Sequence, residues 1–185
     1  MNANAAVLQW GGSGTDAGQR TAVDSSGNIY TVGTFNGSLD FDPSSGVTLL
    51  SAQGAARDIF ISKRDKDGNF LWARRMGGAA DDQVNAIAVD PSGNVVVAGG
   101  VKGTSVYIDS TVPSFDSTRN SQSNYLLDSF VLKLSPSGAY IWHNVIKAPG
   151  DDVINGMAVD SSGNIFVTGY SSAIPPTNFG SLTGF

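Results

Sequence analysis

The stretch Asp24-Ser-Ser-Gly-Asn-Ile-Tyr-Thr-Val-Gly33 occurs three times along the chain and decides its fold. It returns as Asp90-Pro-Ser-Gly-Asn-Val-Val-Val-Ala-Gly99 and as Asp160-Ser-Ser-Gly-Asn-Ile-Phe-Val-Thr-Gly169. The copies start 66 and 70 residues apart, from 24 to 90 and from 90 to 160. A recurring unit of this length indicates a repeat architecture in which each unit folds in the same way.

Each copy combines a tight turn with a run of β-branched and aromatic residues, which is typical of a β-hairpin. The Asp side chain can bond the backbone of its own turn, and the Gly three positions later supplies a positive φ. Pro91 stands at the turn position where a φ near −65° is wanted.

A second block repeats between these copies. Residues 58–63 and 67–72, Asp-Ile-Phe-Ile-Ser-Lys and Asp-Gly-Asn-Phe-Leu-Trp, match residues 128–133 and 137–142 at an offset of 70. Each unit therefore holds four strands, expected at about residues 84–89, 94–99, 129–134 and 139–146. A repeated four-stranded antiparallel meander predicts the blades of a β-propeller. The variable segments 35–57 and 100–127 are expected as surface loops, with a short hairpin near residues 47–50 and the best prospects for ligand binding.

Composition supports an all-β class. All 16 acidic residues are Asp, which favours turns and caps, and the 185 residues hold no ten-residue stretch with helical spacing. No apolar run approaches the length of a membrane span. The net charge of −5 argues against nucleic acid as a partner, because phosphate binding needs Lys and Arg clustered on one face. No cysteine is present, and residues 1–10 lack the features of a signal peptide. If the protein is exported, its signal has been removed or lies outside this chain.

The repeated residues resemble the bacterial β-propeller repeat family called SBBP. The resemblance covers residues 11–169 and rests on one set of positions: Gly77-Gly78, Asp82, Ala88-Val89-Asp90, Gly93-Asn94, Gly99, Asp128-Ser129-Phe130-Val131, Lys133-Leu134, Gly138 and Trp142. A variant of the repeat is matched by residues 39–43 together with residues 58–63. The resemblance implies a toroidal propeller and an extracellular or cell-surface setting, and it implies no defined reaction.

The repeat boundaries divide the chain into about two and a half blades. Residues 1–12 are expected to supply the closing strand of a neighbouring blade, with its strand at residues 7–10. Residues 13–78 form blade repeat 1, residues 79–147 blade repeat 2 and residues 148–185 a partial blade repeat 3, in which Lys147-Ala148 replaces the Gly-Gly pair. Because a closed ring needs four to eight blades, the chain is either a piece of a longer protein or a subunit that shares blades with other copies.

No residue is assigned a catalytic role. His143, the only histidine, follows the strand Trp as Ala73 does one unit earlier, so it is expected to face solvent. The carboxylate pairs Asp81-Asp82 and Asp151-Asp152 suggest glycoside hydrolysis. They recur with the unit, however, and Asp16 stands where Asp82 does, so we expect them to accept backbone N–H bonds at the start of a strand.

No cofactor or metal site is assigned either. Residues 65–69, Asp-Lys-Asp-Gly-Asn, resemble the start of a calcium loop, with Asp40 and Asp42 nearby in sequence, but the repeat partner at residues 135–139 has no carboxylate, which favours a plain turn. Residues 11–14, Gly-Gly-Ser-Gly, lack the spacing of a nucleotide loop and are expected to connect blades. Trp72 and Trp142 are expected to pack blades rather than to bind sugars.

These observations predict a non-catalytic propeller segment of a bacterial secreted or cell-surface protein that serves as a binding, adhesion or assembly scaffold. Its partner would be a protein or a carbohydrate, further copies of itself or the remaining blades of a longer chain. Two alternatives stay open: a propeller hydrolase or lyase completed outside this chain, and a structural subunit that assembles through open blade edges.

Overall fold

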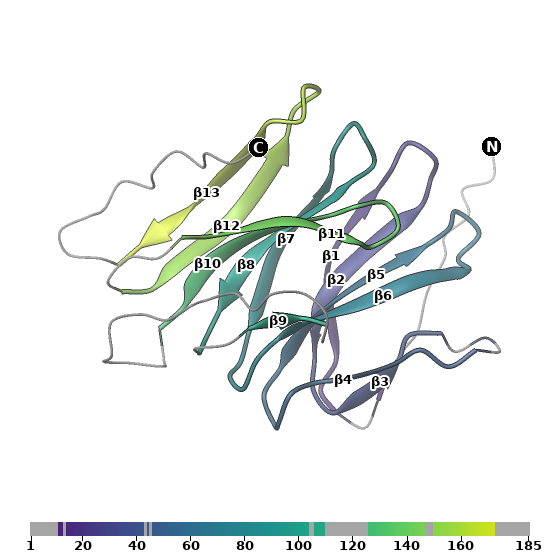
Figure 1. The fold of residues 1–185 in the computed structure, drawn as a ribbon, viewed down its shortest axis with the longest axis horizontal. Coiled ribbons are helices and arrows are strands. Elements are labelled where there is room, and N and C mark those ends of the chain that lie inside the picture. The colour runs from purple at the N-terminus through teal and green to yellow at the C-terminus, as the bar shows by residue number, and fades with distance from the viewer. Residues whose placement is uncertain are drawn as a thin grey trace.

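The computed structural model describes residues 11–12, 14–42, 44, 46–103, 106–109, 126–146 and 150–172, and every element in these ranges is a β-strand (Figure 1). The predicted all-β class is therefore confirmed. In this part of the chain no helix has the length and apolarity needed to cross a membrane.

The first blade is an antiparallel meander of strands β1 (Ala17–Val23), β2 (Ile29–Phe35), β5 (Asp58–Arg64) and β6 (Phe70–Gly77), paired in that order. A two-residue strand from the second repeat, β9 (Tyr107–Ile108), pairs with β6 and extends the sheet by a fifth strand.

The second blade consists of β7 (Gln83–Val89), β8 (Val95–Val101), β10 (Asp128–Leu134) and β11 (Tyr140–Ile146) in the same meander. A third repeat contributes the hairpin of β12 (Asp152–Val159) and β13 (Ile165–Ser171). The described strands thus form two four-stranded propeller-type blades and the first half of a third. The strand expected at residues 7–10, the replaced glycine pair at 147–148 and the end of the chain after residue 172 lie outside the described residues.

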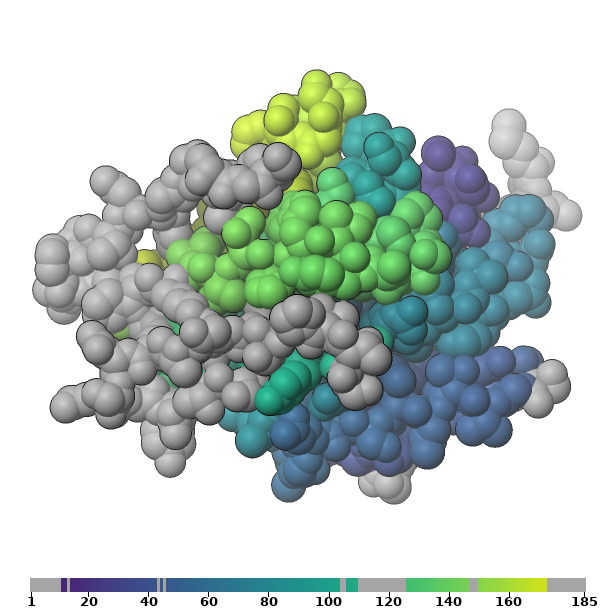
Figure 2. All heavy atoms as spheres, in the orientation of Figure 1, coloured from purple at the N-terminus to yellow at the C-terminus, as the bar shows by residue number. Residues whose placement is uncertain are grey.

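The hydrophobic core lies between the blades, and alternate residues of β8 pack against different neighbouring sheets. Val95 and Val97 pack against the first blade, in one cluster with Val32 and Ile61. The next residues along the strand, Val96 and Ala98, face the third repeat in a cluster with Ile154. Because successive side chains of a strand point to opposite faces, the second blade is covered on both sides, and β8 is buried along its whole length. Figure 2 shows the segment of β10 and β11 in green, between the blue first blade and the yellow third hairpin.

The first strands of the three repeats, β1, β7 and β12, are neighbours, because β7 packs against both of the others. Each of them carries a β-bulge, between Gly18 and Arg20, Val84 and Ala86, and Ile154 and Gly156. The bulge recurs at the same place in every repeat, which identifies it as a feature of the unit.

The loop between β2 and β5 forms a small hairpin of β3 (Ser38–Asp40) and β4 (Leu49–Ser51). Its residues Leu39 and Phe41 are buried in a separate cluster with Phe35 and Phe60. A hairpin near residues 47–50 was expected, and its second strand lies one to two residues later than that range.

Candidate functional site

The hairpin turns gather at one end of the blades, where each leading Asp is locked by its own turn. In Asp24, Asp90 and Asp160, Oδ1 accepts the backbone N–H groups two and four residues later, at 2.8–2.9 Å, and Oδ2 accepts the side-chain amide of the Asn four residues later. The glycines of these turns have φ values of 82°, 80° and 85°. The predicted roles of Asp and Gly are therefore confirmed.

The turn at residues 135–138, between β10 and β11, docks onto the first blade. The carbonyl oxygen of Pro136 accepts the indole N–H of Trp72 at 3.1 Å and the ammonium of Lys63 at 3.0 Å. The carbonyl oxygen of Gly138 accepts Nε of Arg74 at 2.9 Å. Trp72 is 9% exposed, so the prediction that it packs blades is confirmed.

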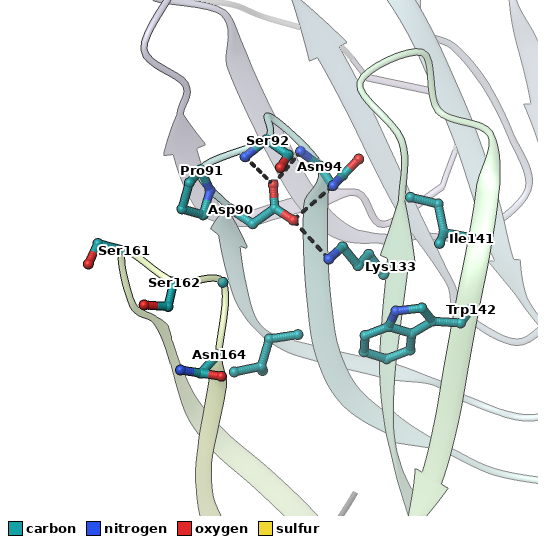
Figure 3. Close-up of a pocket in the computed structure, with 12 residues that line it drawn as sticks. Asp90, Pro91, Ser92, Asn94, Lys133, Ile141, Trp142, Ser161, Ser162 and Asn164 are labelled. Carbon is teal, nitrogen blue, oxygen red and sulfur yellow. Dashed lines mark hydrogen bonds and ion pairs between the residues drawn. The ribbon is translucent and has the colours of Figure 1, made fainter. Parts of the chain in front are cut away.

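A pocket of about 770 Å³ lies at the same end, between the second blade and the third repeat (Figure 3). One wall is the side of the second blade with Lys133, Ile141 and Trp142, and the opposite wall is the turn at residues 161–164. Trp142 also packs against the cluster that joins the second blade to the third repeat, so it contributes to blade packing as predicted.

Asp90, which stands at the head of this pocket, is held in its ionised form. Lys133 Nζ lies 2.8 Å from its Oδ2, and the backbone and side chain of Asn94 donate to it. Burial raises the pKa of Asp90, but the bonds from Lys133 and Asn94 outweigh burial and hold the pKa below its usual value. A carboxylate with both oxygens engaged in this way acts as a structural anchor for the turn.

At the opposite end of the blades, the paired aspartates join successive repeats. Arg57 N–H donates to Asp81 Oδ1 at 2.8 Å, and the N–H of Asp82 donates to the carbonyl of Arg57 at 3.0 Å. The same two bonds recur 70 residues later, from Leu127 to Asp151 and from Asp152 to Leu127, both at 2.9 Å. The carboxylate pairs that suggested glycoside hydrolysis therefore form hydrogen bonds at the junctions between repeats.

Asp82 is 1% exposed and accepts the backbone N–H of Gly78 at 3.1 Å and of Lys102 at 3.0 Å. Asp16 accepts the N–H of Gly12 in the same way, so the predicted bonds at the start of the strand are confirmed for both residues. Burial raises the pKa of Asp82 to about 8; the two N–H donors oppose this shift, and the carboxylate of Asp58 adds to it. Asp58, fully buried, is paired with Arg75 Nη1 at 2.5 Å.

The prediction that His143 faces solvent is wrong. Its side chain is half-buried on β11, where its Nδ1 lies 2.9 Å from the hydroxyl of Tyr140. Burial lowers the pKa of His143 below its ordinary value. The hydroxyl comes from Tyr140, whose counterpart in the first blade is Phe70, and His143 itself stands where the first blade has Ala73.

The turn at residues 65–69, which resembles the start of a calcium loop, has the same hydrogen bonds as the turns that begin with Asp24, Asp90 and Asp160. Asp65 accepts the N–H groups of Asp67 and Asn69 and the Asn69 side-chain amide. Asp40 accepts the N–H groups of Asp42 and Thr48. Among the described residues, no group of three or more His, Cys, Asp or Glu side chains is placed to hold a metal ion.

Two structural features were missed from the sequence. The glycines that end the repeated stretch, Gly33, Gly99 and Gly169, lie against the bulge of the preceding strand, where a β-carbon would overlap a backbone carbonyl oxygen. These glycines recur at the tenth position of the repeated stretch, and this recurrence could have indicated a close approach of two backbones. The pairing of β9 with β6 was also missed, because residues 107–108 fall in a segment that was expected to be a surface loop.

Repeated meanders that shelter one another's faces, with the same turns and junctions in each unit, define a β-propeller repeat protein. A model of the family described as "SBBP: Beta-propeller repeat" matches residues 141–174, which comprise β11 and the third hairpin. The SBBP β-propeller repeat is therefore present in the chain at residues 141–174.

Two curated proteins are similar to the chain over most of its length. It is 31% identical to "Uncharacterized WD repeat-containing protein L264" of Acanthamoeba polyphaga mimivirus, over 92% of the chain and 14% of that protein. It is 27% identical to "Regulatory protein FlaEY" of Caulobacter vibrioides, over 88% of the chain and 16% of that protein. The chain therefore spans only a small part of the length of these relatives.

Proposed function

We propose that this chain is a non-catalytic set of propeller blades in a secreted or cell-surface protein, where it serves as a scaffold for binding, adhesion or assembly. The observation that carries the proposal is that the recurring carboxylates form hydrogen bonds within the turns and the repeat junctions. Asp24, Asp90 and Asp160 occupy equivalent turns, and Asp81 and Asp151 occupy equivalent junctions, so the acidic side chains that recur with the unit are engaged in holding it together.

The physical logic of such a scaffold is that neighbouring sheets supply its stability. Each blade buries its faces against the next, as β8 does on both sides, and the loops between the second and third strands of a blade are then free to differ. Those loops do differ between the two complete repeats, and they remain the predicted place for a protein or carbohydrate ligand. The relative whose name identifies a WD repeat-containing protein supports the repeat-scaffold class.

Protease shaving of intact cells tests the location that the proposal requires. Cells of the organism that encodes the protein are treated briefly with proteinase K and probed with an antibody raised against this chain, with a cytosolic enzyme as the control for lysis. Loss of the signal from intact cells, or its presence in cell-free medium, supports a surface or secreted scaffold. Full protection in intact cells with digestion after lysis would overturn it.

A further inference from the structure

Two carboxyl groups from successive repeats are buried against the same peptide, at the junction of the first repeat with the second. Asp58, the first residue of β5, is 0% exposed, and Asp82, directly before β7, is 1% exposed. A β-carbon on Gly77 would overlap the carboxyl group of Asp58, and the N–H of Gly78 donates to Asp82 Oδ2 at 3.1 Å. The two acids therefore contact adjacent residues at the end of β6.

Arg75 supplies a single positive charge to these two buried acids. Its Nη1 pairs with Asp58 Oδ2 at 2.5 Å, whereas the bonds to Asp82 come from the backbone N–H groups of Gly78 and Lys102. Two ionised carboxylates would leave one buried negative charge without a counter-charge, which is strongly unfavourable in a protein interior. Charge balance at this site therefore requires one proton.

The other charged groups around the junction are paired with one another. Arg57 lies 3.3 Å from Asp81, and their side chains are 46% and 50% exposed. The charge of Lys102 acts on Asp81, and Asp109, which follows β9, lies 3.4 Å from Nε of Arg74. These groups leave the buried acids with the one positive charge described above.

One carboxylate oxygen of Asp58 lacks a donor. Oδ2 of Asp58 accepts the N–H of Gln53 at 2.9 Å and pairs with Arg75, whereas Oδ1 is buried and has no hydrogen-bond partner among the described residues. A protonated carboxyl group is a hydrogen-bond donor. A proton on Asp82 would therefore satisfy this oxygen and remove the excess negative charge.

We infer that Asp58 and Asp82 share one proton beside the Gly77-Gly78 peptide, and that loss of this proton loosens the junction between the first two repeats in alkaline solution. The hydroxyl of Asp82 donates to Oδ1 of Asp58 and so ties the start of β5 to the start of β7. Burial, with a smaller contribution from the charge of Asp58, raises the pKa of Asp82 to about 8. Because this folded value lies above the unfolded value, the stabilisation is complete below the unfolded pKa and is lost as pH rises through about 8.

Titration of the carboxyl carbons tests the shared proton. The full chain is labelled with carbon-13 at Cγ of aspartate, and the midpoint of Asp82 is followed by NMR in the parent and in two variants. Asp58→Asn should lower this midpoint by at least about one pH unit, because it removes the neighbouring negative charge and the acceptor. Asp81→Asn removes the exposed acid that adjoins Asp82 in sequence, and as the matched control it should cause a smaller shift.

Hydrogen exchange of the parent chain tests the loosening without any substitution. The N–H groups of Gly78 and Lys102 donate to Asp82, and the N–H of Asn94, which donates to Asp90, is the control. After correction for the pH dependence of chemical exchange, the protection of the first two should fall about tenfold between pH 7 and pH 9. The protection of Asn94 should stay constant, and Asp82→Asn should abolish the fall at Gly78 and Lys102.

Two results would overturn the inference: an Asp82 midpoint that is the same in the parent and in Asp58→Asn, and equal protection of Gly78 and Lys102 at pH 7 and pH 9. The first would assign the titration of Asp82 to burial alone, and the second would show that the junction stays closed after the proton is lost. Circular dichroism confirms that each variant keeps the strand content of the parent. The inference does not depend on the scaffold role, which protease shaving tests separately.

Discussion

Trp72 donates its indole N–H to the carbonyl oxygen of Pro136 at 3.1 Å, across the boundary between two blades and 64 residues of chain. Lys63 donates to the same oxygen, and its ammonium lies 4.8 Å from the centre of the Tyr30 ring. One backbone carbonyl oxygen of the second blade therefore accepts hydrogen bonds from two side chains of the first. Blade stacking in this protein is fixed by directional bonds as well as by apolar contact.

Trp72→Phe should lower the free energy of unfolding by about 1 kcal/mol, because the ring is largely kept while one bond to Pro136 is lost and Lys63 still satisfies the carbonyl. Urea denaturation followed by circular dichroism measures the change. Leu71→Ala, at a side chain 48% exposed on the same strand, is the control and should have a smaller effect. A larger loss at Leu71 would contradict the assignment.

Gly99→Ala should destabilise the second blade by at least about 2 kcal/mol, because the new β-carbon would overlap the carbonyl oxygen of Gln83 in the bulged strand. The midpoint of thermal unfolding should fall by several degrees. Gly11→Ala, where a β-carbon would meet no atom within 4 Å, should leave the midpoint nearly unchanged. Equal midpoints for the two variants would show that the bulge relaxes to admit the methyl group.

Asp82→Asn should change how stability depends on pH. Burial raises the pKa of Asp82 to about 8 in the folded protein from an ordinary value of 3.8, so between these values the folded state holds a proton that the unfolded state has lost. Stability from this group is complete below the unfolded pKa and declines as pH rises toward the folded pKa, by up to about 1.4 kcal/mol per pH unit. The amide of Asn cannot ionise, so the variant should lose this decline and gain relative stability at pH 8.

Asp81→Asn is the matched control for that experiment. The bonds from Arg57 to Asp81 hold the pKa of this exposed carboxyl below its usual value. Its contribution is therefore present above the unfolded pKa and is lost on acidification, which is the opposite sign. Urea denaturation at pH 5, 6.5 and 8 separates the two. A parallel pH profile for wild type and Asp82→Asn would show that Asp82 is ionised in the folded protein.

His143 should titrate below its ordinary pKa of 6.5, because burial disfavours the charged imidazole. The unfolded chain then binds a proton more readily, so stability from this group is complete above pH 6.5 and falls as pH drops through the folded pKa. The ring C–H signals in proton NMR give the midpoint directly, since the sequence has one histidine. The same titration in concentrated urea should return the midpoint to about 6.5, and equal midpoints would contradict burial.

The strands and turns were predictable because their signals are local. Asp90, Gly93 and Asn94 specify their turn within five residues, and the β-branched residues that follow fit a sheet covered on both faces. The recurrence of the aspartates in every repeat predicted that they accept backbone N–H bonds, as Asp16 and Asp82 do. The half-buried His143 was misjudged, since it contacts the hydroxyl of Tyr140 and the first repeat has Phe70 and Ala73 at these two positions.

The docking of turns onto the next blade was not predictable in detail. Trp72 was expected to pack blades, but its acceptor is a backbone carbonyl, which no side-chain pattern reveals. The elevated pKa of Asp82 depends in the same way on burial between repeats. The pocket beside Trp142 lies between the second blade and the third repeat. Its size depends on how closely these two sheets approach, which the sequence does not indicate.

The strand β9 belongs by sequence to the second repeat and by hydrogen bonding to the first blade, where Ile108 faces Met76 and Tyr107 faces Gly77. Asp109, directly after it, accepts the N–H of Arg75 at 3.1 Å and lies 3.4 Å from Nε of Arg74. Under a mechanical load applied along the chain, β6 would not peel away until this clasp had opened. The first two blades should therefore unfold together under tension rather than one after the other.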